Sequence, residues 1–192
     1  MSWDPESTAQ RDTLLEHIRG ISSVPPVILI DGPSGSGKTS LARFLADELA
    51  EPLSIVHMDD LYPGWDGLDI ASNSVVRDLL APLRSTGRGR WQRWDWSRGE
   101  PAEWHDVFGP NLVIVEGCGT LSRASVALAD LRVWLSADDE LRKRRALDRD
   151  GETFEKKWDQ WQANFDRYVE RESPTRNANM HLTITSWPLV TL

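Results

Sequence analysis

The residues with the clearest chemistry form one short run, GPSGSGKT, from Gly32 to Thr39. The run fits the pattern G-x-x-x-x-G-K-[ST], in which glycines let the backbone wrap closely around an anion. Its backbone N–H groups would point at the α- and β-phosphates of a nucleotide, at the start of a helix. Lys38 would bridge the β- and γ-phosphates, and the Thr39 hydroxyl would bind Mg²⁺. The run predicts a nucleotide site made of Ser34, Gly35, Ser36, Gly37, Lys38, Thr39 and Ser40.

Such a loop works between a strand and a helix, and the sequence predicts both. Residues 27–31, VILID, form a β-branched run that predicts a buried strand before the loop. Residues 38–50 predict a helix after it, because apolar side chains recur at helical spacing: Leu41, Phe44, Leu45 and Leu49. A turn that caps a helix and binds nothing is the alternative, but strand, motif and helix together favour nucleotide binding.

The rest of the chain repeats the alternation of strands and helices. Apolar runs predict further strands over residues 53–57, 112–115, 131–135 and 181–185. Helical spacing predicts helices over residues 7–19, 73–83, 138–149 and 154–171. Large and polar residues alternate around Gly99 over residues 90–107, which predicts a small antiparallel hairpin.

This order of elements predicts an α/β fold. Buried strands that alternate with helices favour a parallel sheet covered on both faces, here a three-layer α/β/α arrangement with five strands. One domain is expected for residues 1–192, since a single core serves a chain of up to roughly 200 residues.

The composition argues against several classes of protein. The net charge of −8 disfavours a nucleic-acid polymer as partner, because such binding neutralises phosphates with lysine and arginine. No apolar run approaches the ~18 residues of a transmembrane helix, and the first residues lack the pattern of a secretory signal. A single cysteine, Cys118, forms no internal disulfide, and no paired Cys/His pattern predicts zinc. We expect a cytoplasmic protein with no membrane partner, and the sequence leaves a homodimer open.

The motifs favour a kinase of small molecules over other nucleotide-binding proteins. The sequence contains neither the N/T-K-x-D motif of GTPases nor the LSGGQ signature of ABC ATPases. In their order along the chain, several segments resemble the uridine kinase and phosphoribulokinase group of P-loop kinases. Besides the phosphate loop, these are MDDLY, WDW, IVEG, RRALDRD and ANMHLTI. The resemblance covers residues 27–184 and implies the P-loop NTPase fold of nucleoside and nucleotide kinases, with a lid over about residues 138–155, and with ATP and Mg²⁺.

Two carboxylate positions after predicted strands gain a role from this resemblance. It implies that Asp59 orients and deprotonates the acceptor hydroxyl, with Asp60 as the less favoured choice. The location suits this chemistry, because strand ends of an open α/β sheet face the ligand crevice. A turn-forming pair is the alternative. Glu116 follows the strand over residues 112–115 and is a candidate Mg²⁺ ligand through water, or a partner in a salt bridge.

The same resemblance implies where the acceptor binds. Tyr62 and Asp66, in the loop over residues 61–70, and Trp94 in the hairpin would supply stacking faces and a hydrogen-bond acceptor. Arg93 could meet an anionic group on the acceptor, or lie solvated on the hairpin. The histidine expected shortly after the hairpin motif is missing, and SRGEP stands in its place. This departure makes uridine itself a less favoured acceptor.

Cations cluster in the predicted lid: Arg142, Lys143, Arg144, Arg145 and Arg149. A lid that lowers arginines onto the transferring phosphates would stabilise their charge and exclude water. The resemblance carries over Arg145 as a catalytic residue and Arg149 as a nucleotide-binding residue. A solvated helix with internal ion pairs is the alternative.

We therefore expect an ATP-dependent phosphotransferase that moves the γ-phosphoryl group to a hydroxyl of a nucleoside-like small molecule. IDGPSGSGK also resembles the start of cytidylate kinases, so a nucleoside monophosphate kinase is the first alternative. Arg90, Arg93 and Arg98 would then bind the phosphate of the acceptor. A nucleotide-dependent regulatory ATPase is the second alternative. Its docking surface would be the aromatic stripe over residues 158–168, although such a stripe is more often core.

Overall fold

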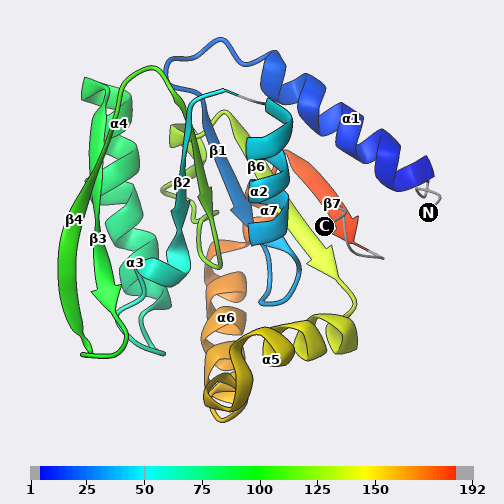
Figure 1. Cartoon of the computed structure of the whole chain (residues 1–192), viewed down its shortest axis with the longest axis vertical. Helices are drawn as coiled ribbons and strands as arrows, with labels where there is room; N and C mark the ends of the chain where they lie inside the picture. The colour runs from blue at the N-terminus through cyan, green and yellow to red at the C-terminus, as the bar shows by residue number, and fades with distance from the viewer. Residues whose placement is uncertain (1–4, 50, 185–192) are drawn as a thin grey trace.

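Figure 1 shows a computed structural model of the chain, in which residues 5–49 and 51–184 are described. Its centre is a sheet of five parallel strands in the order β2-β5-β1-β6-β7. The strands are β1 (Val27–Asp31), β2 (Leu53–His57), β5 (Leu112–Glu116), β6 (Leu131–Ala137) and β7 (Met180–Ile184). The predicted α/β fold with a five-stranded parallel sheet is confirmed. Thr185, which the prediction placed in the last strand, lies outside the described residues.

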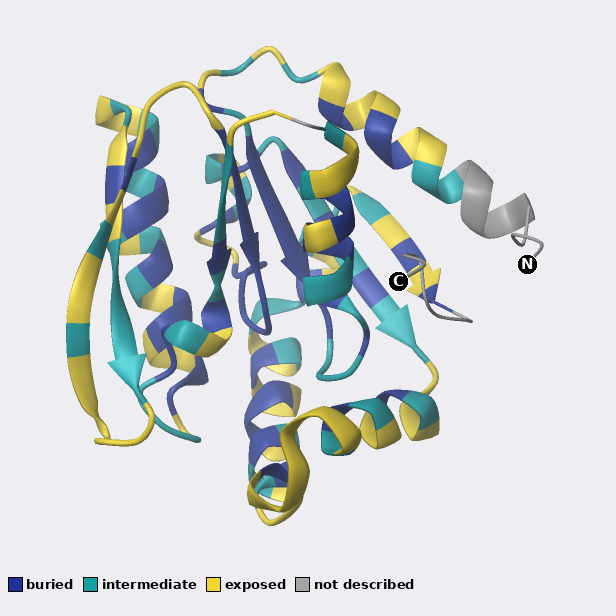
Figure 2. Cartoon of the chain, in the orientation of Figure 1, coloured by how far each residue is buried: buried dark blue, intermediate teal, exposed yellow. Residues whose placement is uncertain are grey.

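Helices cover both faces of the sheet, because both faces of its central strands are apolar. Figure 2 shows β1 and β5 buried along their whole length. In β1, Ile28 and Ile30 pack with α1 (Pro5–Arg19) and α2 (Lys38–Leu49), whereas Val27 and Leu29 face the opposite layer. That layer contains α3 (Leu68–Ser74), α4 (Ala81–Thr86) and α6 (Trp158–Glu172). This alternation produces the predicted three layers.

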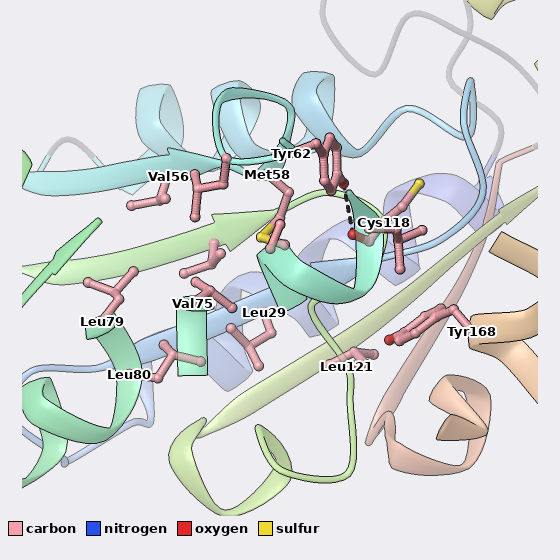
Figure 3. Packing of buried hydrophobic residues seen from close by; sticks show 14 of the residues in the cluster. Leu29, Val56, Met58, Tyr62, Val75, Leu79, Leu80, Cys118, Leu121 and Tyr168 are labelled. Carbon is pink, nitrogen blue, oxygen red and sulfur yellow. Dashed lines mark hydrogen bonds between the residues drawn. The ribbon is translucent and has the colours of Figure 1, made fainter. Parts of the chain in front are cut away.

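Buried apolar side chains form two clusters, one on each face of the sheet. The larger cluster lies on the face covered by α3, α4 and α6, and Figure 3 shows part of it. Leu29 of β1 and Val56 of β2 meet Leu79 and Leu80 from the helical layer. Each is at most 1% exposed, and full burial of such a side chain contributes about 1.5–3 kcal/mol. The carboxyl ends of β1, β2 and β5 are therefore held at fixed positions, and the loops that follow them form the candidate site.

The helix predicted over residues 73–83 is longer than expected. It begins at Leu68 as α3, continues through a π-helical turn, η2 (Val75–Leu80), and ends with α4. Glycine and aspartate over residues 61–70 favoured a loop, but Leu68 and Ala71 are buried at helical spacing, so core packing decides the structure. Gly87, with φ of 73°, ends the helix in the left-handed conformation.

The predicted hairpin and the helix predicted for the lid region are both present. The hairpin pairs β3 (Arg88–Asp95) with β4 (Glu100–Phe108) in antiparallel fashion. The lid helix α5 (Asp139–Glu155) runs past its predicted end at residue 149 and is kinked at Gly151, where φ is 67° and ψ is −160°. The short elements are η1 (Met58–Asp60), η3 (Val126–Leu128) and α7 (Pro174–Asn177). Within residues 5–49 and 51–184, none of the helices combines the length and apolarity that crossing a membrane requires.

Candidate active site

The loop from Gly32 to Thr39 connects β1 to α2, as the motif predicts. The ammonium group of Lys38 lies over the loop and donates hydrogen bonds to the carbonyls of Gly32, at 2.8 Å, and Pro33, at 3.0 Å. Gly35 has φ of 78°, and a Cβ there would lie 1.9 Å from the carbonyl oxygen of Arg142 in the lid helix. Only glycine fits this position, because the lid lies directly against the phosphate loop.

Asp31, the last residue of β1, anchors the loop from within the core. Its buried carboxylate accepts hydrogen bonds from the backbone of Gly32 at 2.7 Å, of Leu121 at 2.9 Å and of Gly119 at 3.2 Å. The hydroxyl of Tyr168 in α6 donates a fourth, at 2.6 Å. Burial raises the pKa of Asp31, and these donors offset part of the rise. The start of the phosphate loop is thereby tied to the loop after β5 and to α6.

The aromatic stripe on α6 is buried, as its spacing predicted: Trp158, Trp161, Phe165 and Tyr168. Trp161 also contacts the phosphate loop, because its indole N–H donates to the hydroxyl of Ser34 at 2.9 Å. The sequence assigned this residue to the core or to a docking surface, and not to the phosphate loop. No sequence pattern reveals a hydrogen bond between residues 127 positions apart.

A pocket of about 420 Å³ lies over the phosphate loop. It brings together these predicted site residues: Ser34, Gly35, Gly37, Lys38, Thr39, Ser40, Asp59, Glu116, Arg145 and Arg149. Ser36 is fully buried and does not line it. Arg43 and Cys118 line the pocket and were missed by sequence reasoning. Burial raises the pKa of the Cys118 thiol to about 11, so the thiol stays protonated near neutral pH.

Thr39, Glu116 and His57 form one corner of this site. The Thr39 hydroxyl donates to Oε1 of Glu116 at 2.8 Å, and Nδ1 of His57 lies 2.6 Å from the same oxygen. Burial alone would raise the pKa of Glu116, but His57, Lys38 and Thr39 more than offset this and lower it. The Glu116 carboxylate in turn raises the pKa of His57. Glu116 is therefore ionised at neutral pH.

This corner suits Mg²⁺, which prefers oxygen ligands and keeps several waters. A hydroxyl that donates its proton to a carboxylate keeps its lone pairs for a cation, and Thr39 is in this state. Ionised Glu116 supplies the negative charge. No group of three or more His, Cys, Asp or Glu side chains that could hold a metal ion occurs among the described residues.

Asp59 follows β2 within η1 and faces the pocket, whereas Asp60 does not line it. Partial desolvation by the surrounding protein raises the pKa of Asp59, and the charge of Glu116 raises it further. The positive charges of Arg149 and Lys38 offset part of this rise. The side chain is 64% exposed, which limits the shift. Nη2 of Arg149 lies 3.9 Å from Oδ2 of Asp59. Asp59 is thus open to a ligand and lies close to the positive charge of Arg149.

The two lid arginines differ in how they are held. Arg149 is paired with Asp150, with a distance of 2.6 Å between Nη2 and Oδ2, and this carboxylate raises its pKa. Arg145 lines the pocket, and its Nη1 is buried without a hydrogen-bond partner among the described residues. Burial and the nearby charge of Arg144 lower the pKa of Arg145. Neither cause is a carboxylate, so among the described residues the charge of Arg145 is not neutralised by an ion pair and can meet an anion in the pocket.

Of the residues predicted to bind the acceptor, Asp59 lines this pocket, whereas Tyr62, Asp66, Arg93 and Trp94 do not. Tyr62 is buried, and its hydroxyl donates to the carbonyl of Cys118 at 2.8 Å (Figure 3). Asp66 accepts hydrogen bonds from two side chains of α6, which lower its pKa. Arg93 is paired with Glu103 at 2.7 Å on the hairpin. Arg93 and Trp94 line a second pocket of about 220 Å³, between the hairpin and the helical layer.

Trp96, not Trp94, is the hairpin tryptophan that reaches Asp59. Its indole N–H donates to the carbonyl of Asp59 at 2.8 Å, and its ring lies 5.0 Å from that of Trp65. Trp96 remains 41% exposed. The motif WDW contained this residue, but sequence alone did not show which of the two tryptophans turns toward the site.

Comparisons with known proteins agree with this geometry. No family model matches the chain. A cytidylate kinase from Methanoculleus marisnigri is 35% identical over 133 residues, which are 65% of this chain and 61% of that protein. The chain thus aligns with about three fifths of the length of this relative.

Solved structures show the same fold at low sequence identity. A possible uridine kinase from Bacillus stearothermophilus is 20% identical, with a TM-score of 0.66 over 92% of this chain and 99% of that one. Phosphoribulokinase from Rhodobacter spheroides is 18% identical, with a TM-score of 0.58 over 86% of this chain and 71% of that one. The chain therefore has the P-loop kinase fold, and its resemblance to the uridine kinase and phosphoribulokinase group, first indicated by its motifs, is confirmed at the level of the fold.

Proposed function

We propose that this protein is an ATP-dependent kinase that transfers the γ-phosphoryl group to a hydroxyl of a small, nucleoside-like molecule. One observation carries the proposal: a single pocket is lined by the phosphate loop, by Asp59 and by Arg145. These are the parts that phosphoryl transfer requires, since positioning and charge stabilisation do most of the catalysis.

In the proposed reaction, Asp59 accepts the proton of the acceptor hydroxyl as the hydroxyl oxygen bonds to the γ-phosphorus. The bond between the γ-phosphorus and the β–γ bridging oxygen breaks, and ADP leaves with that electron pair. Lys38 and Arg145 would stabilise the charge on the transferring group. Arg149, near Asp59, would keep the carboxylate oriented toward the acceptor.

The cofactor would be held by Thr39, directly, and by Glu116, through water. When bound there, Mg²⁺ would supply positive charge that offsets the negative charge of the phosphates. The ionised state of Glu116 and the donated proton of Thr39 support this assignment.

The positions of the hairpin arginines favour an acceptor without a phosphate group. Arg93 is paired with Glu103, and Arg98 with Glu100 at 2.8 Å. Arg90 lies over the ring of Trp104, 4.3 Å from its centroid. None of the three lines the pocket that contains Asp59. This argues against the monophosphate kinase alternative, although the sequence match to a cytidylate kinase keeps it in the test.

The regulatory alternative loses its proposed docking surface. The stripe on α6 is at most 7% exposed, so no partner protein can reach it in this conformation. A kinase with a small-molecule acceptor remains the better supported function.

Trp96 is expected to form a wall of the acceptor site, because it is exposed and its indole N–H donates to the backbone carbonyl of Asp59. Trp96→Ala should raise KM for the acceptor by about tenfold, as expected from the loss of a stacking face. Trp104→Ala is the matched control, since this hairpin tryptophan is similarly exposed, at 43%, but does not contact Asp59. Steady-state kinetics at saturating ATP would measure both. Equal effects of the two substitutions would place the acceptor elsewhere.

The proposed function is tested by ADP release from Mg-ATP across a panel of acceptors. The panel contains nucleosides, nucleoside monophosphates, pantothenate and sugars. Stimulation by an uncharged hydroxyl compound supports the proposal. Stimulation by a monophosphate alone would establish the first alternative instead, and a flat panel with stimulation by a protein would favour the second.

A further inference from the structure

His57 has no place in the chemistry described so far, yet it contacts the side chain assigned to the cofactor. It is the last residue of β2 and lies opposite Glu116, the last residue of β5, in the parallel register. Its Nδ1 lies 2.6 Å from Oε1 of Glu116. The hydroxyl of Thr39 donates to the same oxygen at 2.8 Å. Two donors thus converge on one oxygen of a carboxylate that is 4% exposed.

This arrangement leaves the other oxygen of Glu116 uncommitted. Among the described residues, no hydrogen bond reaches Oε2 of Glu116. A carboxylate held at one oxygen cannot rotate freely about its last bond, so its second oxygen keeps a fixed direction. Residues that hold a metal-binding side chain in this way contribute to metal affinity without touching the metal.

We propose that His57 is a positioning residue, which holds Glu116 through Oε1 so that its second oxygen is directed to the water shell of nucleotide-bound Mg²⁺. The inference rests on the proposed function, since it assigns Glu116 to the cofactor. A purely structural role explains the site less well, because the His57 side chain is 34% exposed. The contact with Glu116 is the only hydrogen bond of the His57 imidazole within the part of the chain that the structure describes.

If the proposal is correct, only a residue with a donor at the position of Nδ1 can replace His57. In asparagine the amide nitrogen is attached to Cγ, as Nδ1 is in histidine, so His57→Asn can keep the donor to Oε1. In glutamine the nitrogen is one bond farther out, and alanine has no donor. The three variants therefore separate the hydrogen bond from the volume and polarity of the side chain.

The test is the dissociation constant of ADP for the full chain, measured by calorimetry in excess Mg²⁺ and again in EDTA. In the unsubstituted protein, Mg²⁺ should tighten ADP binding. In His57→Ala this tightening should fall by about tenfold, the usual effect of losing such a partner, while the affinity in EDTA stays unchanged. His57→Asn should restore the tightening, and His57→Gln should behave as His57→Ala. Melting temperatures would show that each variant is folded.

Several outcomes overturn the proposal. His57→Ala could match the unsubstituted protein, or it could weaken ADP binding equally in Mg²⁺ and in EDTA, which would indicate a structural role. His57→Asn could restore the tightening by Mg²⁺ no better than His57→Gln does. The donor at the Nδ1 position would then not be the reason for the loss in His57→Ala. If Mg²⁺ leaves ADP binding unchanged in the unsubstituted protein, the proposal fails although the nucleotide site stands. If ADP does not bind in either condition, the proposed function itself fails.

Discussion

Replacing Asp59 with asparagine should lower kcat by about 10²–10⁴-fold, the usual contribution of a general base. Asparagine preserves the shape of the side chain but cannot accept the proton of the acceptor hydroxyl. The affinity for ATP should change little, because the phosphate loop and the lid supply the other contacts in this pocket. Single-turnover phosphoryl transfer and equilibrium ATP binding would measure the two effects separately.

The matched control is Asp60→Asn. Asp60 is the adjacent carboxylate but does not line the pocket. The Asp60→Asn substitution should therefore keep kcat within a few-fold of that of the unsubstituted protein. A loss confined to Asp60→Asn would transfer the role of base to that residue. Equal and small losses in both variants would remove the carboxylate base from the mechanism.

The raised pKa of Asp59 adds a dependence on pH to this prediction. The base must be deprotonated, so kcat/KM should fall as the pH falls through its pKa. Since partial desolvation by the surrounding protein and the charge of Glu116 raise that pKa, the decline should begin at a higher pH than for an ordinary aspartate. Arg149 opposes the rise, and Arg149→Gln should move the decline to a still higher pH. A decline that does not move would show that another group controls the profile.

The sequence predicted the parts of the site that depend on local pattern. A β-branched strand, a glycine-rich loop and a helix determine the phosphate site without long-range information. Asp59 was singled out by the resemblance to the uridine kinase and phosphoribulokinase group, and its position agrees with that role: Asp59 and Glu116 both follow strands, and parallel strands place their carboxyl ends at one edge of the sheet. Both line the pocket in the structure.

The residues that the sequence missed depend on contacts between distant segments. His57 is one of four histidines without a motif, and only the register of β2 against β5 brings it to Glu116. Cys118 lines the pocket because the loop after β5 packs beside the phosphate loop, where its thiol lies 3.7 Å from the Lys38 ammonium. No periodicity in the chain reveals such pairs.

At the predicted acceptor site, the sequence did not show which hairpin side chains point toward the pocket. The motif WDW predicted that the hairpin reaches the site, but not which side chain does so. The pairing of β3 with β4 shifts register between Gln92 and Trp94, which disturbs the simple alternation of faces. Trp94 consequently lines the second pocket, and Trp96, beyond the end of the strand, meets Asp59.

Replacing Lys38 with alanine should lower kcat by about 10²–10³-fold, as expected for the loss of one preorganised donor to the transferring group. In the structure its ammonium is held by the carbonyls of Gly32 and Pro33, and the side chain is largely buried. The positive charge is thus in place before the nucleotide arrives. The loop should keep its shape in the variant, because Asp31 anchors its start independently.

The effect of Lys38→Ala should depend on the number of phosphates in the ligand. Lys38 would contact the β- and γ-phosphates, so binding of ATP and ADP should weaken while AMP binding stays nearly unchanged. Lys143→Ala is the control, because this lysine is exposed on the lid helix and does not line the pocket. Calorimetry with the three nucleotides, and a melting curve for each variant, would measure these effects. Equal weakening of ATP, ADP and AMP binding would indicate that Lys38 stabilises the loop and does not contact the phosphates. Stabilisation of the transferring group would then depend on the lid arginines alone.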